Sequence, residues 1–293
     1  MAHEDWIKAG KITSEVREYG KTLVKPGASL FETAELIEAK IRELGGEVGF
    51  PVNISMNNIA AHYTPIPDDD LVFKDQVVKI DIGVQVNGAM GDSAVTIDLS
   101  GQYEKLVEAS EKALENAISI LKEGITLGEI GKVIQDTINS YGFTPIKNLS
   151  GHGLDYYTVH CPPQIPNYDT GDKTELKRGM YFAIEPFATN GSGLVKESGE
   201  AMIYSQIDKK PVRDMTSRKF LKSMGALNGL PFATRHFAKE FGVGRMKLAL
   251  RKLKLAGNVK DYPPLVEEKD RVVSQAEHSF HIDNEGNVIV LTK

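Results

Sequence analysis

The sequence predicts an α+β protein built from two related halves, in which helices cover the outer face of a curved, mainly antiparallel sheet. Three observations lead to this fold class. The chain contains an internal repeat, each copy joins a helix to strand-like segments, and a basic stretch of different composition interrupts the chain before its last strands. The overall composition, 41% hydrophobic and 26% charged over 293 residues, is ordinary for a globular protein.

The first part of the repeat predicts a helix in each half. KPGASLFETAELIEAKIRELGGEVGFPVNIS begins at Lys25, and KEGITLGEIGKVIQDTINSYGFTPIKNLS begins at Lys122. Both copies carry a capping box, in which a Ser or Thr precedes the helix and a Glu follows three residues later. The residues are Ser29 with Glu32, and Thr126 with Glu129. Gly45 and Gly142 suit the ends of these two helices.

The second part of the repeat places polar residues at matching positions. His62 in AHYTPIP aligns with His160 in VHCPPQIP. Asp81 in VVKIDIG aligns with Glu185 in YFAIEP. Each half therefore predicts a helix, a histidine before a Pro-rich loop, and a strand with one acid inside it.

Two further elements lie outside the repeat. Apolar residues at helical spacing predict a helix from Gln102 to Lys122. The final stretch, RVVSQAEHSFHIDNEGNVIVLTK, predicts two strands around a turn at Asn284 to Gly286 and carries another embedded acid, Glu277.

A hairpin at KIDIGVQVNGAMGDSAVT fixes the relation between two acids. Asn87-Gly88 predicts a two-residue type I′ turn, so that Gly83 faces Asp92 across the hairpin. Alternation then puts Asp81 and Asp92 on one face, roughly 7 Å apart, and two carboxylates this close repel unless a proton or cation lies between them. A solvated outer face remains the alternative for a hairpin taken alone. The opposite face is apolar, with Val78, Ile80, Ile82, Val84, Val86, Val95 and Ile97.

Residues 205–262 differ from the rest of the chain in charge. They contain 14 Lys and Arg against 4 Asp and Glu, a net charge of +10 in a chain of net charge -5. This shift predicts an inserted basic, helical, winged-helix-like subdomain at 205–262, within a main domain formed by 1–204 and 263–293. RMKLALRKLKLAGNV predicts an amphipathic helix, whose apolar contacts would be Met246, Leu248, Leu250, Leu253 and Leu255. Its solvated residues would be Arg245, Lys247, Arg251, Lys252 and Lys254.

The embedded acids and one histidine form a candidate metal site. Its members are Asp81, Asp92, Glu185, Glu277 and His152 in NLSGHGL. Four carboxylates that face one space are destabilising without cations, and two divalent ions would balance their charge. Oxygen ligands with one imidazole suit Co, Mn, Fe(II) or Zn, and two such ions side by side are a standard aminopeptidase arrangement. Taken singly, Glu185 also fits an edge strand, because Pro186 follows it.

These motifs resemble a known family. Phe50-Pro51, IAAHY, KIDIGVQVNG, GDSAVT, NLSGHG, VHCPP, AIEPFATNGSG, YPPL and AEHSF follow the order of the motifs in methionine aminopeptidases of the pita-bread fold, over essentially the whole chain. The basic segment lies where type 2 enzymes carry a helical insertion. Because the Lys-rich N-terminal extension typical of eukaryotic type 2 enzymes is lacking, the chain is similar to their shorter, archaeal form. The resemblance implies a fold with a pseudo-twofold axis through the site.

The resemblance also implies a role for each metal ligand. Asp81 and His152 would bind metal from opposite sides of the site. Asp92 and Glu277 would bridge two ions. Glu185 would bind one ion and shuttle a proton from the bridging water.

Further residues would contact the substrate. The resemblance implies that His160 hydrogen-bonds the scissile carbonyl and that His62 contacts the scissile amide or the next residue. His62 would also be the residue that the epoxide inhibitors of the family alkylate. Phe50, Pro51 and Tyr262 would line an apolar pocket for the methionine side chain, although ordinary core packing explains Phe50 and Tyr262 equally well.

The expected function is removal of the initiator methionine from nascent chains when the second residue is small. We expect a cytoplasmic protein without membrane association, because the N-terminus lacks a signal peptide and the single cysteine, Cys161, fits a reducing compartment. We expect a monomer, because no apolar stripe is left without an assigned partner. Two alternatives remain: a proline-directed aminopeptidase of the same fold, and a non-catalytic protein that binds RNA or ribosomes. The basic insertion would either keep its helices soluble or hold the enzyme near ribosomal RNA.

Overall fold

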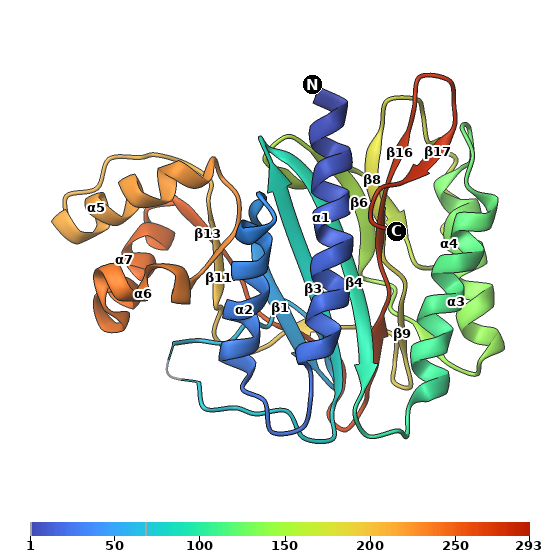
Figure 1. Cartoon of the computed structure of the whole chain (residues 1–293), viewed down its shortest axis with the longest axis horizontal. Helices are drawn as coiled ribbons and strands as arrows, with labels where there is room; N and C mark the ends of the chain where they lie inside the picture. The colour runs from blue at the N-terminus through green and yellow to red at the C-terminus, as the bar shows by residue number, and fades with distance from the viewer. Residues whose placement is uncertain (1, 68) are drawn as a thin grey trace.

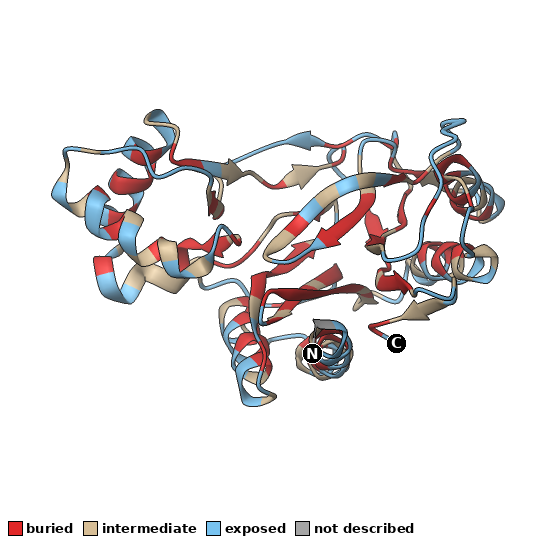
Figure 2. Cartoon of the chain, turned by 90° about the horizontal axis from the view of Figure 1, so that it is seen from above, coloured by how far each residue is buried: buried red, intermediate tan, exposed pale blue. Residues whose placement is uncertain are grey.

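The computed structural model describes residues 2–67 and 69–293 and shows two helix-backed halves that face each other across a central site (Figures 1 and 2). The first half consists of α1 (Ala2–Leu23), α2 (Leu30–Glu43), β1 (Glu47–Met56), β2 (Ile59–Ala61), β3 (Val77–Val86) and β4 (Ala89–Asp98). β1, β3 and β4 form an antiparallel sheet in that order, with α1 and α2 on its outer face.

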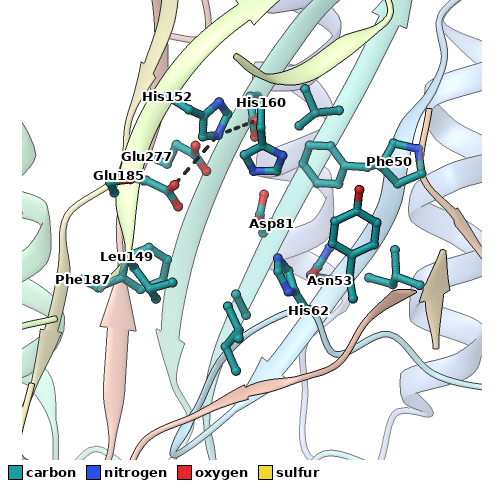
Figure 3. A pocket seen from close by; sticks show the side chains of 18 of the residues that line it. Phe50, Asn53, His62, Asp81, Leu149, His152, His160, Glu185, Phe187 and Glu277 are labelled. Carbon is teal, nitrogen blue, oxygen red and sulfur yellow. Dashed lines mark ion pairs between the residues drawn. The ribbon is translucent and has the colours of Figure 1, made fainter. Parts of the chain in front are cut away.

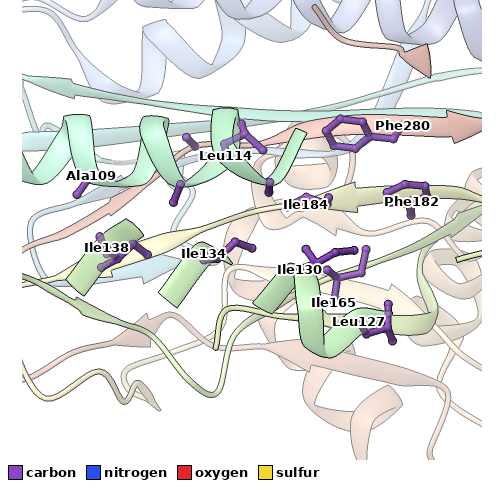
Figure 4. Close-up of a cluster of buried hydrophobic side chains, with 14 of the residues drawn as sticks. Ala109, Leu114, Leu127, Ile130, Ile134, Ile138, Ile165, Phe182, Ile184 and Phe280 are labelled. Carbon is purple, nitrogen blue, oxygen red and sulfur yellow. The ribbon is translucent and has the colours of Figure 1, made fainter. Parts of the chain in front are cut away.

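The second half repeats this plan with a larger sheet. Its elements are α3 (Glu104–Ile120), α4 (Leu127–Ser140), β5 (Thr144–Pro145), β6 (Ser150–Asp155), β7 (Thr158–Pro166), β8 (Tyr181–Ile184), β9 (Phe187–Thr189), β15 (Val273–Gln275), β16 (His278–Ile282) and β17 (Val288–Val290). Five strands pair in the order β17-β16-β8-β6-β7, and β15, β9 and β5 form a smaller sheet. Figure 4 shows α3 and α4 packed on β8 and β16 through Leu114, Ile134, Phe182 and Phe280.

The repeat predicted from the sequence is present in the backbone hydrogen bonds. Ser29 and Thr126 each cap the following helix, α2 or α4, with a bond from the Glu amide three residues later. At Thr126 the backbone amide donates in return to Glu129 Oε2 at 2.9 Å, which completes the capping box. The carbonyl groups just before the two caps, of Ala28 and Ile125, accept equivalent hydrogen bonds from later segments of the chain. Phe73 N donates to Ala28 O at 3.0 Å, and Leu176 N donates to Ile125 O at 2.9 Å.

The β3–β4 hairpin has the predicted register. Asn87 and Gly88 have φ angles of 51° and 90°, as a type I′ turn requires. Gly83 lies opposite Asp92, and Asp81 lies opposite Ala94. The face with Val78 and Ile80 is buried against α1 and α2, as expected, so the acids lie on the other face.

The C-terminal segment differs from the prediction of two strands. It forms three, because the chain leaves the ladder at Ala276 and Glu277, between β15 and β16. The segment that pairs with it has a matching break at Glu185 and Pro186, between β8 and β9. Since β8 lies between β6 and β16, Glu185 does not follow an edge strand.

The two halves meet where these breaks lie against β4. Glu277 N donates to Ala94 O at 3.1 Å. Hydroxyl groups make most of the other links: Ser93 Oγ donates to Glu277 O at 2.6 Å, and Ser279 Oγ donates to Asp92 O at 2.6 Å. The centre of the molecule is therefore fixed by side-chain hydrogen bonds across an interrupted sheet.

The polar N-terminal segment, for which the sequence predicts no element, forms α1. It buries Ile12 and Val16 against the first half, whereas the buried Trp6 stacks on Tyr181 of β8 with 3.9 Å between the ring centroids. Arg17 Nη1 donates to Ser93 Oγ at 2.7 Å and to Thr292 O at 3.1 Å, which ties α1 to β4 and to the end of the chain. No helix among the described residues is long and apolar enough to cross a membrane.

The basic segment forms a group of helices beside the first half (Figure 1). Its elements, with the short strands that flank it, are β10 (Lys196–Glu197), β11 (Ile203–Gln206), α5 (Met215–Met224), a 3₁₀ turn (Gly225–Leu227), β12 (Phe232–Ala233), α6 (Thr234–Phe241), α7 (Val243–Leu255), β13 (Val259–Tyr262) and β14 (Leu265–Val266). β11 pairs with both β12 and β13. The helices share a separate hydrophobic cluster that includes Phe220, Phe232 and Leu253.

Helix α7 corrects the predicted amphipathic pattern. Met246, Leu250 and Leu253 are buried, but Leu248 and Leu255 are 54% and 82% exposed. The reason is the helical period, which places these two leucines on the solvent side of α7. Three of its lysines are also ion-paired: Lys247 with Glu200, Lys252 with Asp214, and Lys254 with Asp261.

Candidate active site

A cavity of about 210 Å³ lies at the junction of the two halves and the basic segment. The four predicted acids and His152 all border it. Figure 3 shows Asp81, His152, Glu185 and Glu277 directed towards one space. The structure thus brings the candidate metal ligands together from both halves.

Three of these residues meet most closely. Single ligand atoms of Asp92, His152 and Glu277 lie within 4.8 Å of one another, and all three side chains are buried. His152 Nε2 lies 3.7 Å from Asp92 Oδ2 and 3.8 Å from Glu185 Oε1. These separations leave room for a cation between the groups.

A buried glutamine, Gln275, orients the two remaining acids. Its Nε2 donates to Glu185 Oε2 at 3.3 Å, and its side chain also hydrogen-bonds Asp81. Gln275 ends β15, two residues before Glu277, and is 1% exposed. The sequence analysis did not predict a role for Gln275, although a polar residue close to an embedded acid in a buried strand indicates a supporting residue.

The electrostatics of the acids favour bound cations. Burial raises the pKa of Asp81 to about 7. Burial also raises the pKa values of Asp92, Glu185 and Glu277 well above the ordinary range, and the neighbouring carboxylates raise them further. These four groups cannot all be ionised at neutral pH unless positive charge lies among them.

Orphaned oxygen atoms show that the residues fit a metal. Asp81 Oδ1, Asp92 Oδ1 and Glu277 Oε2 are buried and have no hydrogen-bond partner. Buried carboxylate oxygens normally have partners, and a divalent ion would supply the missing contact. The donor set of carboxylates with one imidazole suits Mn, Co, Fe(II) or Zn.

His152 has the protonation state that a ligand needs. Burial lowers its pKa to about 4, so the ring is neutral at pH 7. Nδ1 lies 3.3 Å from Gly153 O, and this contact identifies Nδ1 as the protonated nitrogen and leaves the Nε2 lone pair directed at the acids. Gly153 is required there, because a Cβ on it would lie 2.3 Å from Pro162 O.

His160 and His62 border the same cavity from β7 and from the end of β2. The His160 ring lies 4.2 Å from the His152 ring, between centroids. Burial lowers the pKa of His160 most, and His152 and His62 lower it further. The residue is nevertheless exposed to solvent at the mouth of the cavity. Burial lowers the pKa of His62 to about 4. Both rings are therefore neutral at pH 7.

His62 has an unusual backbone conformation. Its φ angle is 65°, in the left-handed region that few residues other than glycine adopt. Its ring packs edge-on against Tyr262 at 5.8 Å, and its Nδ1 is buried without a hydrogen-bond partner. Strain of this kind is concentrated at functional sites, which supports a role for His62 in the cavity.

The predicted apolar pocket is present, with one difference. Phe50 and Tyr262 border the cavity. The Phe50 ring lies directly over Gly83, where a Cβ would come within 2.2 Å of the ring. Pro51 is buried but does not border the cavity in the described structure, because successive residues of a strand point to opposite faces and Phe50 already faces the cavity.

Several lining residues could not have been found from local sequence. They come from loops and strands that only the tertiary structure brings together, namely Ala61, Leu149, Val159, Phe187, Ile203, Pro231 and Leu265. Most are apolar, and an apolar residue in a strand carries no signal that separates a pocket wall from the core.

Comparisons with known proteins agree with this geometry. The sequence model of metallopeptidase family M24 matches residues 4–215. Methionine aminopeptidase from Methanocaldococcus jannaschii is 45% identical over 99% of this chain and 98% of its own length, and that from Thermococcus onnurineus is 44% identical over 98% of each chain. Methionine aminopeptidase 2 from Schizophyllum commune is 38% identical and is covered over 69% of its length.

Solved structures share the fold. Methionine aminopeptidase from Thermotoga maritima superimposes with a TM-score of 0.71 at 25% identity, over 99% of this chain and 96% of that one. A thermophilic Arx1 gives a TM-score of 0.84 at 16% identity, over 98% and 90% of the two chains. The pita-bread fold expected from the motifs is therefore confirmed.

Proposed function

This chain belongs to metallopeptidase family M24, and from that premise we propose that it removes the N-terminal methionine from newly made polypeptides. The observation that supports this most is the set of orphaned carboxylate oxygens beside an apolar pocket. The carboxylates fit a metal-dependent hydrolase, and the apolar residues of the pocket fit an apolar side chain such as methionine.

We infer that the five ligands hold two divalent ions. Ions bound here would supply an activated water and a polarised scissile carbonyl. Asp92 and Glu277, whose ligand atoms lie close to each other, would contact both ions, while Asp81 and His152 would each contact one. Co, Mn, Fe(II) and Zn all suit these donors.

The chain's own residues then act on the substrate. Glu185, whose pKa is raised by burial and by the neighbouring carboxylates, would accept a proton from the attacking water and pass it to the leaving amine. A neutral His160 donates a hydrogen bond to the oxyanion that forms at the scissile carbonyl. His62, beside Tyr262, orients the residue after methionine.

The pocket explains the expected specificity. Phe50 and Tyr262 surround the methionine side chain, and a metal ion held by the acids would bind its free amine. Cleavage is therefore confined to the first peptide bond. Because one methylene is a weak determinant, about 1–3 kcal/mol, norleucine should be accepted in place of methionine.

Hydrolysis of Met-Ala-Ser by metal-free protein, with each of the four metals added in turn, tests the proposal. We expect release of methionine with at least one metal, and none in the matched variant Asp92→Asn. Ala-Pro-Ser is the second substrate, because it reports the proline-directed alternative. Cleavage of Ala-Pro-Ser without cleavage of Met-Ala-Ser would replace the proposed function.

We also propose that residues 205–262 act as a separate basic subdomain that holds a monomeric enzyme near ribosomal RNA in the cytoplasm. Lys209, Lys210, Arg218 and Lys222 border a surface hollow of about 510 Å³, and no acidic side chain borders it among the described residues. RNA phosphates would attract this surface in a salt-dependent way.

Cosedimentation with ribosomes at low and high salt tests the docking proposal. The variant should reverse the charge of Lys209, Arg218 and Lys222, since Lys252 and Lys254 are engaged in ion pairs. Reversal at Lys105, Lys122 and Lys177 on the main body is the matched control. Equal pelleting of both variants would refute docking through this surface.

A further inference from the structure

A β-bulge shapes one wall of the active-site cavity. Phe50 of β1 pairs with Gly83 of β3, and Asn53 pairs with Asp81. The β1 strand therefore advances three residues where β3 advances two. In a regular strand, residues three apart point to opposite faces, so the extra residue is what lets both Phe50 and Asn53 border the cavity.

The bulge frees the backbone of Val52 from the ladder, and two buried side chains bind it. Val52 N donates to Glu38 Oε1 of α2 at 3.2 Å. Thr64 Oγ1 donates to Val52 O at 2.8 Å. Both Val52 groups are thus satisfied by side chains rather than by a neighbouring strand.

One residue of the basic segment connects these two side chains. Arg235, in the first turn of α6, donates from Nη2 to Glu38 Oε1 and from Nη1 to Thr64 Oγ1. Its side chain is 1% exposed, and that of Glu38 is 2% exposed. Because the Thr64 hydroxyl proton is directed at Val52 O, its lone pairs are free to accept from Arg235.

The neighbouring residue strengthens the link. His236 Nδ1 accepts from Ala233 N at 3.3 Å, so Nε2 carries the proton and donates to Glu38 Oε2 at 2.9 Å. Burial would raise the pKa of Glu38, but Arg235 and His236 hold it at about 2. Glu38 is therefore ionised at neutral pH and can accept the Val52 amide bond.

We propose that Arg235 is a positioning residue that fixes the Val52 bulge through Glu38 and Thr64, and so places Phe50 and Asn53 in the substrate pocket. The basic segment then does more than supply lining residues such as Pro231 and Tyr262. It holds the opposite wall, which belongs to the main sheet. The identity of the bound side chain rests on the proposed function, but the control of the bulge does not.

Hydrogen exchange at the Val52 amide tests the control of the bulge without reference to activity. In Arg235→Met we expect Val52 exchange to be about tenfold faster or more, because Glu38 loses its buried partner. Arg218→Met is the matched control, since Arg218 is an exposed arginine of the same segment. Thr64→Val removes only the hydroxyl and gives a milder variant if Arg235→Met does not fold. Arg235→Lys, which keeps the charge, should restore part of the protection.

Steady-state kinetics with Met-Ala-Ser tests the effect on the pocket. We expect KM to rise about fivefold or more in Arg235→Met and Thr64→Val, with kcat changed less, because a misplaced Phe50 weakens ground-state binding as well as transition-state binding. Calorimetric metal affinity should equal that of wild type. Discrimination between methionyl and leucyl peptides should fall.

The outcomes separate the two proposals. Wild-type Val52 exchange in folded Arg235→Met and Thr64→Val would overturn the positioning role. Faster exchange with unchanged KM would overturn its connection to the pocket. If wild-type protein cleaves no methionyl peptide while Val52 exchange still responds to Arg235, the proposed function fails and the control of the bulge stands.

Discussion

The two halves of the molecule supply acids to one site in different ways. In the first half, Asp81 and Asp92 lie on an uninterrupted hairpin whose turn fixes their register. In the second half, Glu185 and Glu277 lie where paired strands leave their ladders. The first pair is placed by local geometry, and the second by contacts between distant strands.

The histidines show a related contrast. His160 lies within β7, in extended backbone, whereas His62 lies just beyond β2 with a φ angle of 65°. The two copies of the repeat therefore share the histidine side chain but not its backbone conformation. We conclude that a repeated sequence can provide the same side chain to a site from two different backbone conformations.

The largest effect should come from removing, from either half, one of the two carboxylates that we propose to bridge the ions. Asp92→Asn and Glu277→Gln should both abolish detectable turnover, because oxygens that bridge two cations would need full charge to hold them. The metal-free variants should be no less stable than wild type, since each substitution relieves repulsion among buried acids. Hydrolysis of Met-Ala-Ser and thermal unfolding of the metal-free proteins measure both effects.

This pair of variants also tests the comparison itself. Asp92 is fixed by the hairpin, so its neighbours should stay in place after substitution. Loss of activity in Asp92→Asn with full activity in Glu277→Gln would show that only the first half carries the metal site.

The next effect concerns the two histidines. His160→Ala should lower kcat on the order of 10²–10³ with little change in metal affinity, because the role we propose for His160 is to stabilise the developing oxyanion. His62→Ala should also slow turnover. Steady-state kinetics measures turnover, and calorimetric titration measures metal affinity separately. If metal affinity in His160→Ala fell as much as kcat, His160 would be a metal ligand instead.

His62 should also react with a fumagillin-type epoxide at unusually low pH. Its pKa of about 4, which results from burial, keeps the ring unprotonated as the pH falls below 6.5, where an ordinary histidine gains a proton. Labelling should therefore continue to about pH 5 and fall near the His62 pKa. Mass spectrometry reads the adduct.

A competing site for the epoxide is available nearby. Burial and Asp155 raise the pKa of Cys161, which keeps its thiol protonated and weakly nucleophilic. An adduct on Cys161, or labelling that survives His62→Ala, would show that the wrong nucleophile has been assigned.

The smallest effect should come from Gln275, which contacts one acid of each half. Gln275→Leu removes the amide that orients Asp81 and Glu185, and loss of such a support typically weakens metal binding about 10–100-fold. Gln164→Leu, at an exposed position in β7, is the control. Calorimetric titration that gives equal affinity for both variants would deny Gln275 this role.

The same contrast explains what the sequence could predict. The register of Asp81 and Asp92 follows from one turn and the alternation of strand residues, and the structure agrees residue for residue. Glu185 and Glu277 were recognisable as embedded acids, but the strand breaks that position them depend on pairing between segments about ninety residues apart. Local propensity carries no information on such breaks.

Other failures have equally physical causes. Pro51 was expected in the pocket because the resemblance implied it, yet alternation along β1 turns it to the face opposite Phe50, and the bulge brings Asn53 to the cavity. Leu248 and Leu255 were expected in the core of the basic segment because they are apolar, but the helical period exposes them. Helix α1 was missed because its polar residues outnumber its buried ones.

The central claim is that acids from both halves converge on one two-metal site. Calorimetric titration of metal-free wild-type protein with Mn²⁺ or Co²⁺ tests it most directly. We expect two ions to bind per chain in the wild type, and Asp92→Asn and Glu277→Gln each to lose at least one of them. A single ion bound in the wild type, or two ions still bound in either variant, would contradict the account.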